Sequence, residues 1–249
     1  MVDTVAFLSC RISRTCTGNM ITRIKNYEKQ LPSRDARKVY VFCEGKGTEP
    51  DYFSFFAELS SNLQIIVIPP EDGTDPLKLM ALAQRRLLDK GCSYTIDYLA
   101  NDSVWFVIDT DTWEAEGKVA PLRDFCALKN SAIQEEYSEV KPYRAWNVTQ
   151  SNPCFEIWLY YHIFDRKPDS EDLESYASFK EFVNASISGG FSFQSDPVRL
   201  QNAIQNAQDN FSINSDGTLG LYATEVYRLG EEILPFVKKV LDRLKMKMR

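Results

Sequence analysis

The fold of this chain is decided by residues 38–56, which read KVYVFCEGKGTEPDYFSFF. Residues 38–43 are a β-branched and aromatic run that stops at the EGKG of residues 44–47, which is typical of a buried strand followed by a tight glycine turn. Thr48 can then cap a helix, and Pro50 suits its first turn. The apolar stripe of this helix consists of Tyr52, Phe53, Phe56 and Leu59.

The pattern of strand and helix continues along the chain. Buried strands are expected at residues 63–70 (LQIIVIPP) and 103–108 (SVWFVI), with a helix at about 76–90 between them. Alternation of this kind produces a parallel sheet with right-handed crossovers. We therefore expect an α/β protein with a Rossmannoid parallel sheet flanked by helices.

The rest of the chain is predicted to be mainly helical. We expect a helix at 119–137, a strand at 144–148, a helix from Ser151 to Tyr161, and further helices at 173–186, 196–211 and 223–248. The expected organisation is a basic N-terminal lead-in at 1–37, a core at 38–165 and a helical C-terminal subdomain at 166–249 packed on the core. Met20 is an alternative start to Met1.

The composition excludes several classes of protein. The 249 residues are 44% hydrophobic and 26% charged, values that are ordinary for a globular protein. No apolar run reaches the roughly 18 to 20 residues that cross a bilayer, so we expect no membrane span. Six scattered cysteines without a CxxC pair and a single histidine do not indicate a zinc site or a disulfide framework. Residues 2–10 lack the features of a signal peptide, and a cytoplasmic protein with reduced thiols is expected.

The net charge of -6 is unevenly distributed. Residues 1–39 carry eight Lys or Arg against three Asp or Glu, and residues 238–249 carry six against one. The intervening residues therefore have a net charge of -16. An acidic body with basic ends is compatible with a cation-dependent site that meets phosphate, and also with a plainly solvated surface.

Three carboxylates follow two of the predicted strands. Glu44 comes after the first strand, and Asp109 and Asp111 come after the third. Parallel strands end at the same edge, so these groups converge if the strands are neighbours. A single strand-end Asp more often forms a turn or caps a helix. Crowded carboxylates without a cation are unfavourable, however, and oxygen ligands favour Mg²⁺ or Mn²⁺.

Four motifs in this order resemble the RloB family, which is related to the Toprim catalytic domains of topoisomerases, primases and OLD-type nucleases. They are CEG at 43–45, TEPxYF at 48–53, FVIDxD at 106–111 and SNPCFExWLxxH at 151–162, with a looser echo at 224–229. The resemblance covers about residues 38–165. It implies a Toprim-like fold and a place in bacterial antiphage, abortive-infection or restriction-linked loci, often beside an AAA/ABC-type ATPase.

The resemblance also implies roles for individual residues. Glu44 matches the Toprim glutamate, a candidate general acid/base, and Asp109 and Asp111 match its metal-binding DxD. The chain departs from longer Toprim patterns after Asp111, where the next acidic residues are Glu114 and Glu116. For phosphodiester cleavage, a metal on the two aspartates would activate water and phosphate while Glu44 moves protons.

Two further residues have two readings each, and a third has one expected role. Glu156 either binds a second cation or favours the N-terminus of its helix. Lys46, between two glycines, either holds a substrate phosphate or is an exposed loop lysine. His162, the only histidine, follows an apolar face and is expected to be a buried side chain with its hydrogen bonds satisfied.

These features together predict a Mg²⁺- or Mn²⁺-dependent nuclease that acts in cellular defence under the control of an ATPase. The sequence leaves open whether the substrate is DNA or RNA, such as tRNA, and whether the protein is a homo-oligomer. One alternative is a non-catalytic partner module of such an ATPase. Another is a phosphatase of the haloacid-dehalogenase type, in which an Asp after the first strand of the core is the nucleophile.

Overall fold

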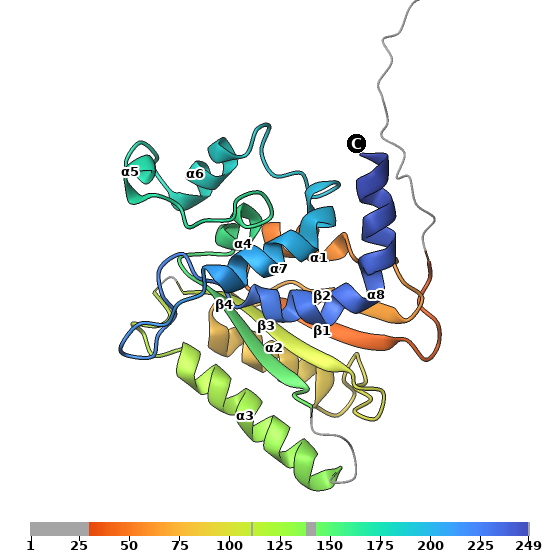
Figure 1. Cartoon of the computed structure of the whole chain (residues 1–249). Coiled ribbons are helices and arrows are strands. Elements are labelled where there is room, and N and C mark those ends of the chain that lie inside the picture. Colours follow the sequence, from red (N-terminus) through yellow and green to blue (C-terminus); the bar gives the residue numbers. More distant parts are fainter. Residues whose placement is uncertain (1–29, 111, 138–142, 249) are drawn as a thin grey trace, which may run out of the picture.

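The computed structural model describes residues 30–110, 112–137 and 143–248. Four strands form one all-parallel sheet in the order β2-β1-β3-β4. They are β1 (Arg37–Cys43), β2 (Leu63–Ile68), β3 (Ser103–Asp109) and β4 (Trp146–Ser151). The predicted α/β fold with helices on both faces of a parallel sheet is thus confirmed (Figure 1), while the Toprim-like assignment stays a prediction.

The observed helices lie near the predicted positions more often than they have the predicted lengths. They are α1 (Thr48–Ser54), α2 (Pro76–Leu87), α3 (Val119–Glu136), α4 (Glu156–Tyr160), α5 (Ser170–Leu173), α6 (Phe179–Ser186), the 3₁₀ helix η1 (Asp196–Arg199), α7 (Leu200–Asp209) and α8 (Val226–Lys247). The C-terminal part is mainly helical, as predicted. Most of the predicted N-terminal lead-in, including Met20, lies outside the described residues.

The helix predicted at 173–186 is divided into α5 and α6. The break has a local cause, because Ser178 Oγ accepts the Glu181 N–H at 3.2 Å and Glu181 Oε2 accepts the Ala177 N–H at 3.0 Å. This reciprocal pair is a capping box, which starts a new helix at Phe179. Thr48 likewise is the first residue of α1 and not its cap, since Gly47 occupies that position.

The strand predicted at 144–148 lies further along the chain. It pairs with β3 from Val104 opposite Trp146 to Asp109 opposite Ser151, so pairing extends to the last residue of β3. The helix expected to start at Ser151 starts instead at Glu156. Asn152 precedes a proline, which disfavours a helical backbone at this position. On its outer edge, the last residue of β4, Ser151, forms an antiparallel bridge with Thr224.

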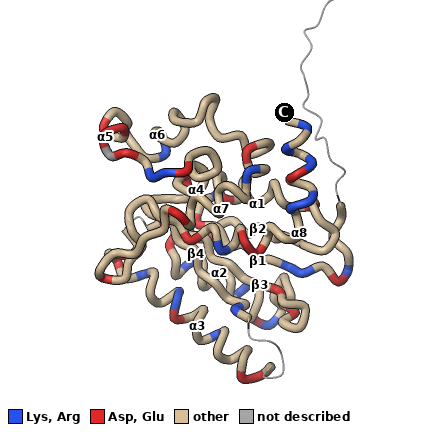
Figure 2. Tube along the Cα trace, in the orientation of Figure 1, with Lys and Arg blue, Asp and Glu red and all other residues tan. Residues whose placement is uncertain are grey.

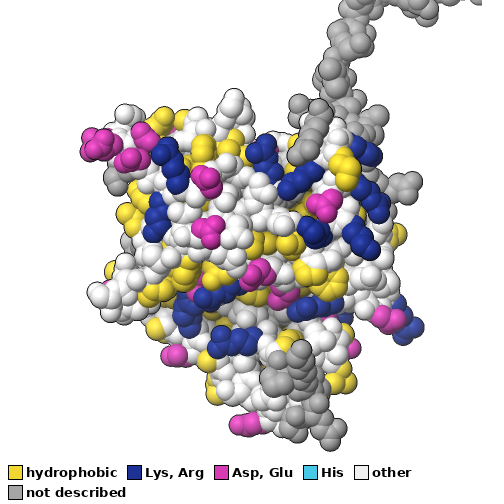
Figure 3. All heavy atoms as spheres, in the orientation of Figure 1, with side chains coloured by type: hydrophobic (Ala, Val, Ile, Leu, Met, Phe, Trp, Pro, Cys, Tyr) yellow, Lys and Arg dark blue, Asp and Glu magenta, His cyan; other side chains and the backbone are white. Residues whose placement is uncertain are grey.

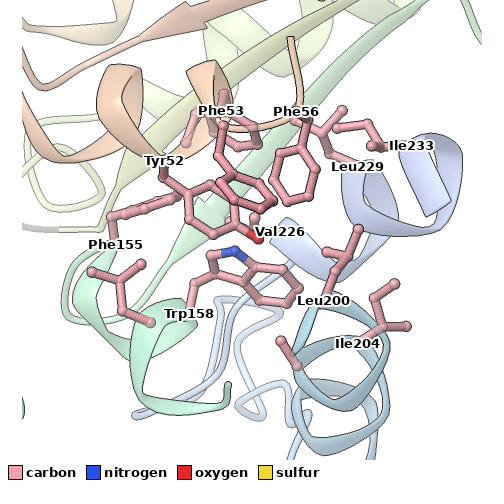
Figure 4. Close-up of a cluster of buried hydrophobic side chains, with 14 of the residues drawn as sticks. Tyr52, Phe53, Phe56, Phe155, Trp158, Leu200, Ile204, Val226, Leu229 and Ile233 are labelled. Atoms are coloured by element: carbon pink, nitrogen blue, oxygen red, sulfur yellow. The ribbon is translucent and has the colours of Figure 1, made fainter. Parts of the chain in front are cut away.

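The sheet separates two apolar cores, one on each of its faces. One joins the sheet to α2 and α3, and the other joins it to α1, α4, α6, α7 and α8. In the second core, Trp158 is fully buried among side chains of α1, α7 and α8 (Figure 4). Tyr52 and Phe155 pack edge-on at a ring separation of 5.6 Å. The helices after residue 165 therefore share one core with the sheet.

Burial in this second core is expected to govern the stability of the whole chain. Leu229 of α8 is 0% exposed, whereas Leu128 of α3 is 69% exposed. We expect Leu229→Ala to lower the free energy of unfolding by about 2–5 kcal/mol, because it removes packed methyl groups and leaves a cavity. The matched change Leu128→Ala should alter it by no more than about 0.5 kcal/mol. Urea denaturation checks both, and equal effects would contradict the shared core.

Candidate active site

In a sheet with this strand order, a site is expected at the carboxyl ends of β1 and β3. The two strands are neighbours, with Cys43 opposite Val107. The chain leaves β1 through α1 on one face and β3 through α3 on the other (Figure 1). A crevice opens at such a switch point beyond the strand ends. Glu44 extends the ladder into it, because its N–H donates to the Val107 carbonyl at 3.0 Å.

Glu44 is held in this crevice by two donors. Its Oε2 accepts the backbone N–H of Asp109 at 2.9 Å, and its Oε1 accepts Nε1–H of Trp113 at 2.7 Å. The side chain is 7% exposed. The structure thus brings Glu44 and Asp109 together, as expected from neighbouring parallel strands. The role of Trp113 in orienting the carboxylate was not predicted, because it depends on how the loop after β3 folds back.

Asp109 is the last residue of β3 and is crowded by negative charge. Its Oδ1 accepts the backbone N–H of Phe155 at 2.8 Å. Burial raises the pKa of Asp109 well above its ordinary value, and nearby carboxylates raise it further. These carboxylates belong to Glu44, Glu49 and Glu156. Protonation is therefore easier here than at an exposed aspartate.

Glu49 joins this group, although it was not predicted as a site residue. It lies in the first turn of α1, is 5% exposed, and its Oε1 accepts the Gly45 N–H at 3.0 Å. Burial raises the pKa of Glu49, while this backbone hydrogen bond lowers it. A signal was present in the sequence: Glu49 has the helical spacing of Tyr52, Phe53 and Phe56 and so lies on the apolar face.

Glu156 begins α4 on the other side of the crevice. It is 8% exposed, and its Oε2 is buried without a hydrogen-bond partner in the described part of the chain. Its Oε1 lies 3.5 Å from Nζ of Lys180, a cation that was not predicted. Burial lowers the pKa of Lys180, but the charges of Glu156 and Asp109 outweigh this effect and raise it. Both readings of Glu156 stay open, since it also occupies a first helical turn.

Two other residues are predicted for the site, Lys46 and Asp111. Lys46 is exposed in the turn after β1 and has no hydrogen bond or ion pair with another described residue. Asp111 lies outside the described residues. Over residues 30–110, 112–137 and 143–248, no three Asp, Glu, His or Cys side chains are already arranged to hold a metal ion. The metal assignment of Asp109, Asp111, Glu44 and Glu156 is therefore still a prediction.

His162 is a structural residue, as expected. It is 1% exposed, and its Nε2 lies 3.1 Å from the Tyr52 hydroxyl. Its Nδ1 lies 3.0 Å from the carbonyl oxygen of Trp158. Burial lowers the pKa of His162 to about 3, so the ring is neutral at physiological pH. It takes no part in the carboxylate group.

A family model described as RloB-like protein matches residues 39–233. The chain belongs to the RloB-like family. The matched span of this RloB-like protein contains Glu44, Glu49, Asp109 and Glu156 and continues far beyond residue 165, where the motif resemblance ends. Comparisons with curated proteins and with solved structures find no match. Among the helices described, not one is both long and apolar enough to span a membrane.

Gly45 is expected to be essential to the placement of Glu49. A Cβ atom at Gly45 would lie 2.0 Å from Glu49 Oε2, whereas one at Gly47 would meet nothing within 4 Å. We expect Gly45→Ala to displace the carboxylate and to lower the free energy of unfolding by about 1–3 kcal/mol through overpacking. Gly47→Ala, two residues away, is the control and should be close to neutral in urea denaturation. A neutral Gly45→Ala variant would contradict the described contact.

Asp109→Asn should stabilise the protein. It removes a charge but keeps the oxygen that accepts the Phe155 N–H. The folded state holds the Asp109 proton more tightly than the unfolded chain. This stabilisation is present below the ordinary aspartate pKa of about 3.9 and is lost as pH rises through the raised pKa. We expect the variant to gain on the order of 1 kcal/mol over the wild type at neutral pH, and the gain to vanish at low pH.

Asp102→Asn is the contrasting control for this experiment. Asp102 is also buried, but each of its oxygens accepts a backbone N–H, from Lys38 at 2.7 Å and from Asp97 at 2.9 Å. An amide can accept only one of them, so this variant should lose about 1–3 kcal/mol. Urea denaturation across pH measures both variants. A loss of stability in Asp109→Asn at neutral pH would show that crowding of charge is not the dominant effect there.

Proposed function

We propose that this RloB-like protein is a Mg²⁺- or Mn²⁺-dependent phosphodiesterase that cleaves nucleic acid at the carboxyl ends of β1 and β3. The observation that carries the proposal is the unpartnered, buried Glu156 Oε2 in a group of carboxylates that raises the pKa of Asp109. The cation paired with this group, Lys180, has a side chain that is 62% exposed. Buried negative charge of this kind is unfavourable unless a cation neutralises it.

The chemistry of the donors fits a hard divalent cation. The side chains that would hold it are Asp109, Glu156, Glu49 and, from the sequence, Asp111. All offer carboxylate oxygens, the ligands that Mg²⁺ and Mn²⁺ prefer. When bound, such a cation polarises the scissile phosphate and lowers the pKa of a water molecule.

Glu44 is suited to move a proton in this reaction. Its carboxylate is fixed by the N–H groups of Asp109 and Trp113, so its orientation toward the crevice is set before substrate binds. A carboxylate held in this way can take a proton from the attacking water or return one to the leaving oxygen. Lys46 and Lys180, both exposed beside the carboxylates, can contact phosphate oxygens.

A basic surface lies at the far end of the sheet from the carboxylates, because Glu232 of α8 bonds to Arg37 and Ser103, the first residues of β1 and β3, and the basic residues of α8 follow it. A long polyanion would therefore contact this surface away from the site of cleavage. Lys and Arg gather along the C-terminal half of α8, as Figure 2 shows, and Lys238, Lys239 and Arg243 are exposed there. Figure 3, in the same orientation, shows Lys and Arg side chains gathered over this part of the molecule. Contacts of lysine and arginine with phosphates supply most of the sequence-independent affinity for nucleic acid. The resemblance adds a defence role and control by an AAA/ABC-type ATPase to the proposal.

Cleavage of plasmid DNA, single-stranded DNA and total tRNA with Mg²⁺ or Mn²⁺ tests the proposal, with and without the AAA/ABC-type ATPase that the resemblance implies. We expect one substrate class to be cut and Glu44→Gln to reduce the rate at least about 100-fold, as for the loss of a general acid/base. Glu135→Gln, an exposed change on α3, is the matched control and should leave the rate unchanged. Absence of metal-dependent cleavage in every combination would overturn the proposal in favour of a non-catalytic partner of the ATPase.

A further inference from the structure

A pocket of about 280 Å³ lies beside the candidate active site. Its walls come from the start of α3, the end of β4 and a short hairpin in which Ile213 bridges Leu219. The hairpin is closed by the Asn214 N–H, which donates to the Thr218 carbonyl at 2.9 Å. The pocket is therefore bounded by backbone that is already in place.

Gln150 organises the polar side of this pocket. It is 1% exposed, and its amide makes three bonds: Nε2 donates to Thr110 Oγ1 at 3.0 Å and to Glu114 Oε2 at 3.1 Å, and Oε1 accepts Nη2–H of Arg123 at 2.9 Å. These bonds fix the orientation of the amide. Gln150 consequently holds an acceptor, Glu114, and a donor, Arg123, on adjacent sides of the pocket.

Both of these side chains keep binding capacity. In the described structure, Arg123 uses only Nη2, for Gln150 and for Glu225 at 2.7 Å, so Nε and Nη1 have N–H groups to donate. Glu114 accepts at Oε2 only, which leaves Oε1 as an acceptor toward the pocket. A ligand with an acceptor edge next to a donor edge would match this pair.

The charge of the pocket disfavours a phosphate. Its lining contains two carboxylates, Glu114 and Glu225, against one guanidinium, Arg123. Glu225 is also paired with Arg228 at 2.9 Å. A neutral polar ligand suits this balance better than an anion does. The rest of the lining is largely apolar and contains Val119, Ala120, Ile213 and Leu219, as expected for contact with the face of a ring.

The pocket is connected to the candidate active site through one residue. Thr110, which accepts the Gln150 bond, directly follows Asp109, and its N–H donates to the Ser151 carbonyl at 2.8 Å. A nucleotide whose phosphate lies at the carboxylates would thus have its neighbouring base within reach of the pocket. If the protein cleaves nucleic acid as proposed, a base of that nucleic acid is therefore the ligand nearest to the pocket.

We propose that this pocket binds a guanine base of the strand that is cleaved, an inference that rests on the proposed nuclease function. Guanine offers O6 as an acceptor to an Nη1–H of Arg123, and its adjacent N1–H and 2-amino group suit the carboxylate of Glu114. Adenine has a single exocyclic donor position and places it where guanine has an acceptor. Uracil and cytosine have one donor group on this edge where guanine has two, so Glu114 and Arg123, held by Gln150, favour guanine.

Titration of the full-length protein with nucleoside 5′-monophosphates in EDTA tests the pocket without requiring cleavage. NMR of the ¹⁵N-labelled protein is expected to show binding of GMP at least about tenfold tighter than that of AMP, CMP or UMP. IMP, which lacks the 2-amino group, should bind between GMP and AMP. Equal affinity for GMP and AMP would overturn the proposal.

Two pairs of variants localise the binding. Ala120→Phe fills the pocket from an exposed position on α3, and Ala127→Phe adds the same ring to the same helix outside the pocket. Glu114→Gln removes the carboxylate acceptor, and Glu116→Gln changes an exposed neighbour that does not line the pocket. The first member of each pair should weaken GMP binding at least about tenfold, and the second should not. Unchanged GMP binding in Ala120→Phe would overturn the proposal.

The two proposals fail in distinguishable ways. If Glu44→Gln abolishes cleavage while GMP and AMP bind alike, the nuclease function stands and the guanine pocket is wrong. If GMP binds selectively and the wild type cleaves nothing, the pocket stands and the nuclease function is wrong. If both hold, the cut sites should lie next to guanosine, and Glu114→Gln should relax this preference.

Discussion

The hydrogen bond from the Asp109 N–H to Glu44 joins the ends of β1 and β3, and the surrounding structure is arranged around this junction. The chain leaves these two strands on opposite faces, so the sheet itself covers neither end. Trp113 packs against the core of α2 and α3 on one face and bonds to Glu44, while α1 and α4 lie together on the other face. A crevice at the strand ends is thus a consequence of the strand order, and the loops determine which groups occupy it.

Backbone donors orient the carboxylates without neutralising them. Glu44, Glu49 and Asp109 each accept one main-chain N–H, from Asp109, Gly45 and Phe155 respectively. These bonds fix the positions of the carboxylates, but the like charges still repel one another. The large aromatic core beneath α1 and α4 supplies the stability that this arrangement removes. The group of carboxylates is thus supported by a core that does not depend on it.

The sequence predicts three of the four strands well, because the apolar runs at 38–43, 63–70 and 103–108 are too short for helices and end at clear turns. It also predicts the meeting of Glu44 with Asp109, which follows from parallel pairing alone. It could not predict the register of β4. The side-chain amide of Asn130 on α3 accepts the backbone N–H of Trp146 and donates to its carbonyl, and these two bonds help to set where the strand begins. Nor could it predict the group of Arg123, Gln150 and Glu225, whose members are far apart in sequence and meet only through tertiary packing.

The bridge between Ser151 and Thr224 has a consequence for the order of folding. The end of β4 obtains its outer backbone partners from residues more than 70 positions later in the chain. In addition to the bridge, the Asn152 N–H donates to the Ala223 carbonyl, and the Glu225 N–H donates to the Gln150 carbonyl. During synthesis, β4 therefore keeps its outer edge open until residues 223–225 have left the ribosome. Contacts of such long separation slow folding and expose an edge to other chains in the meantime.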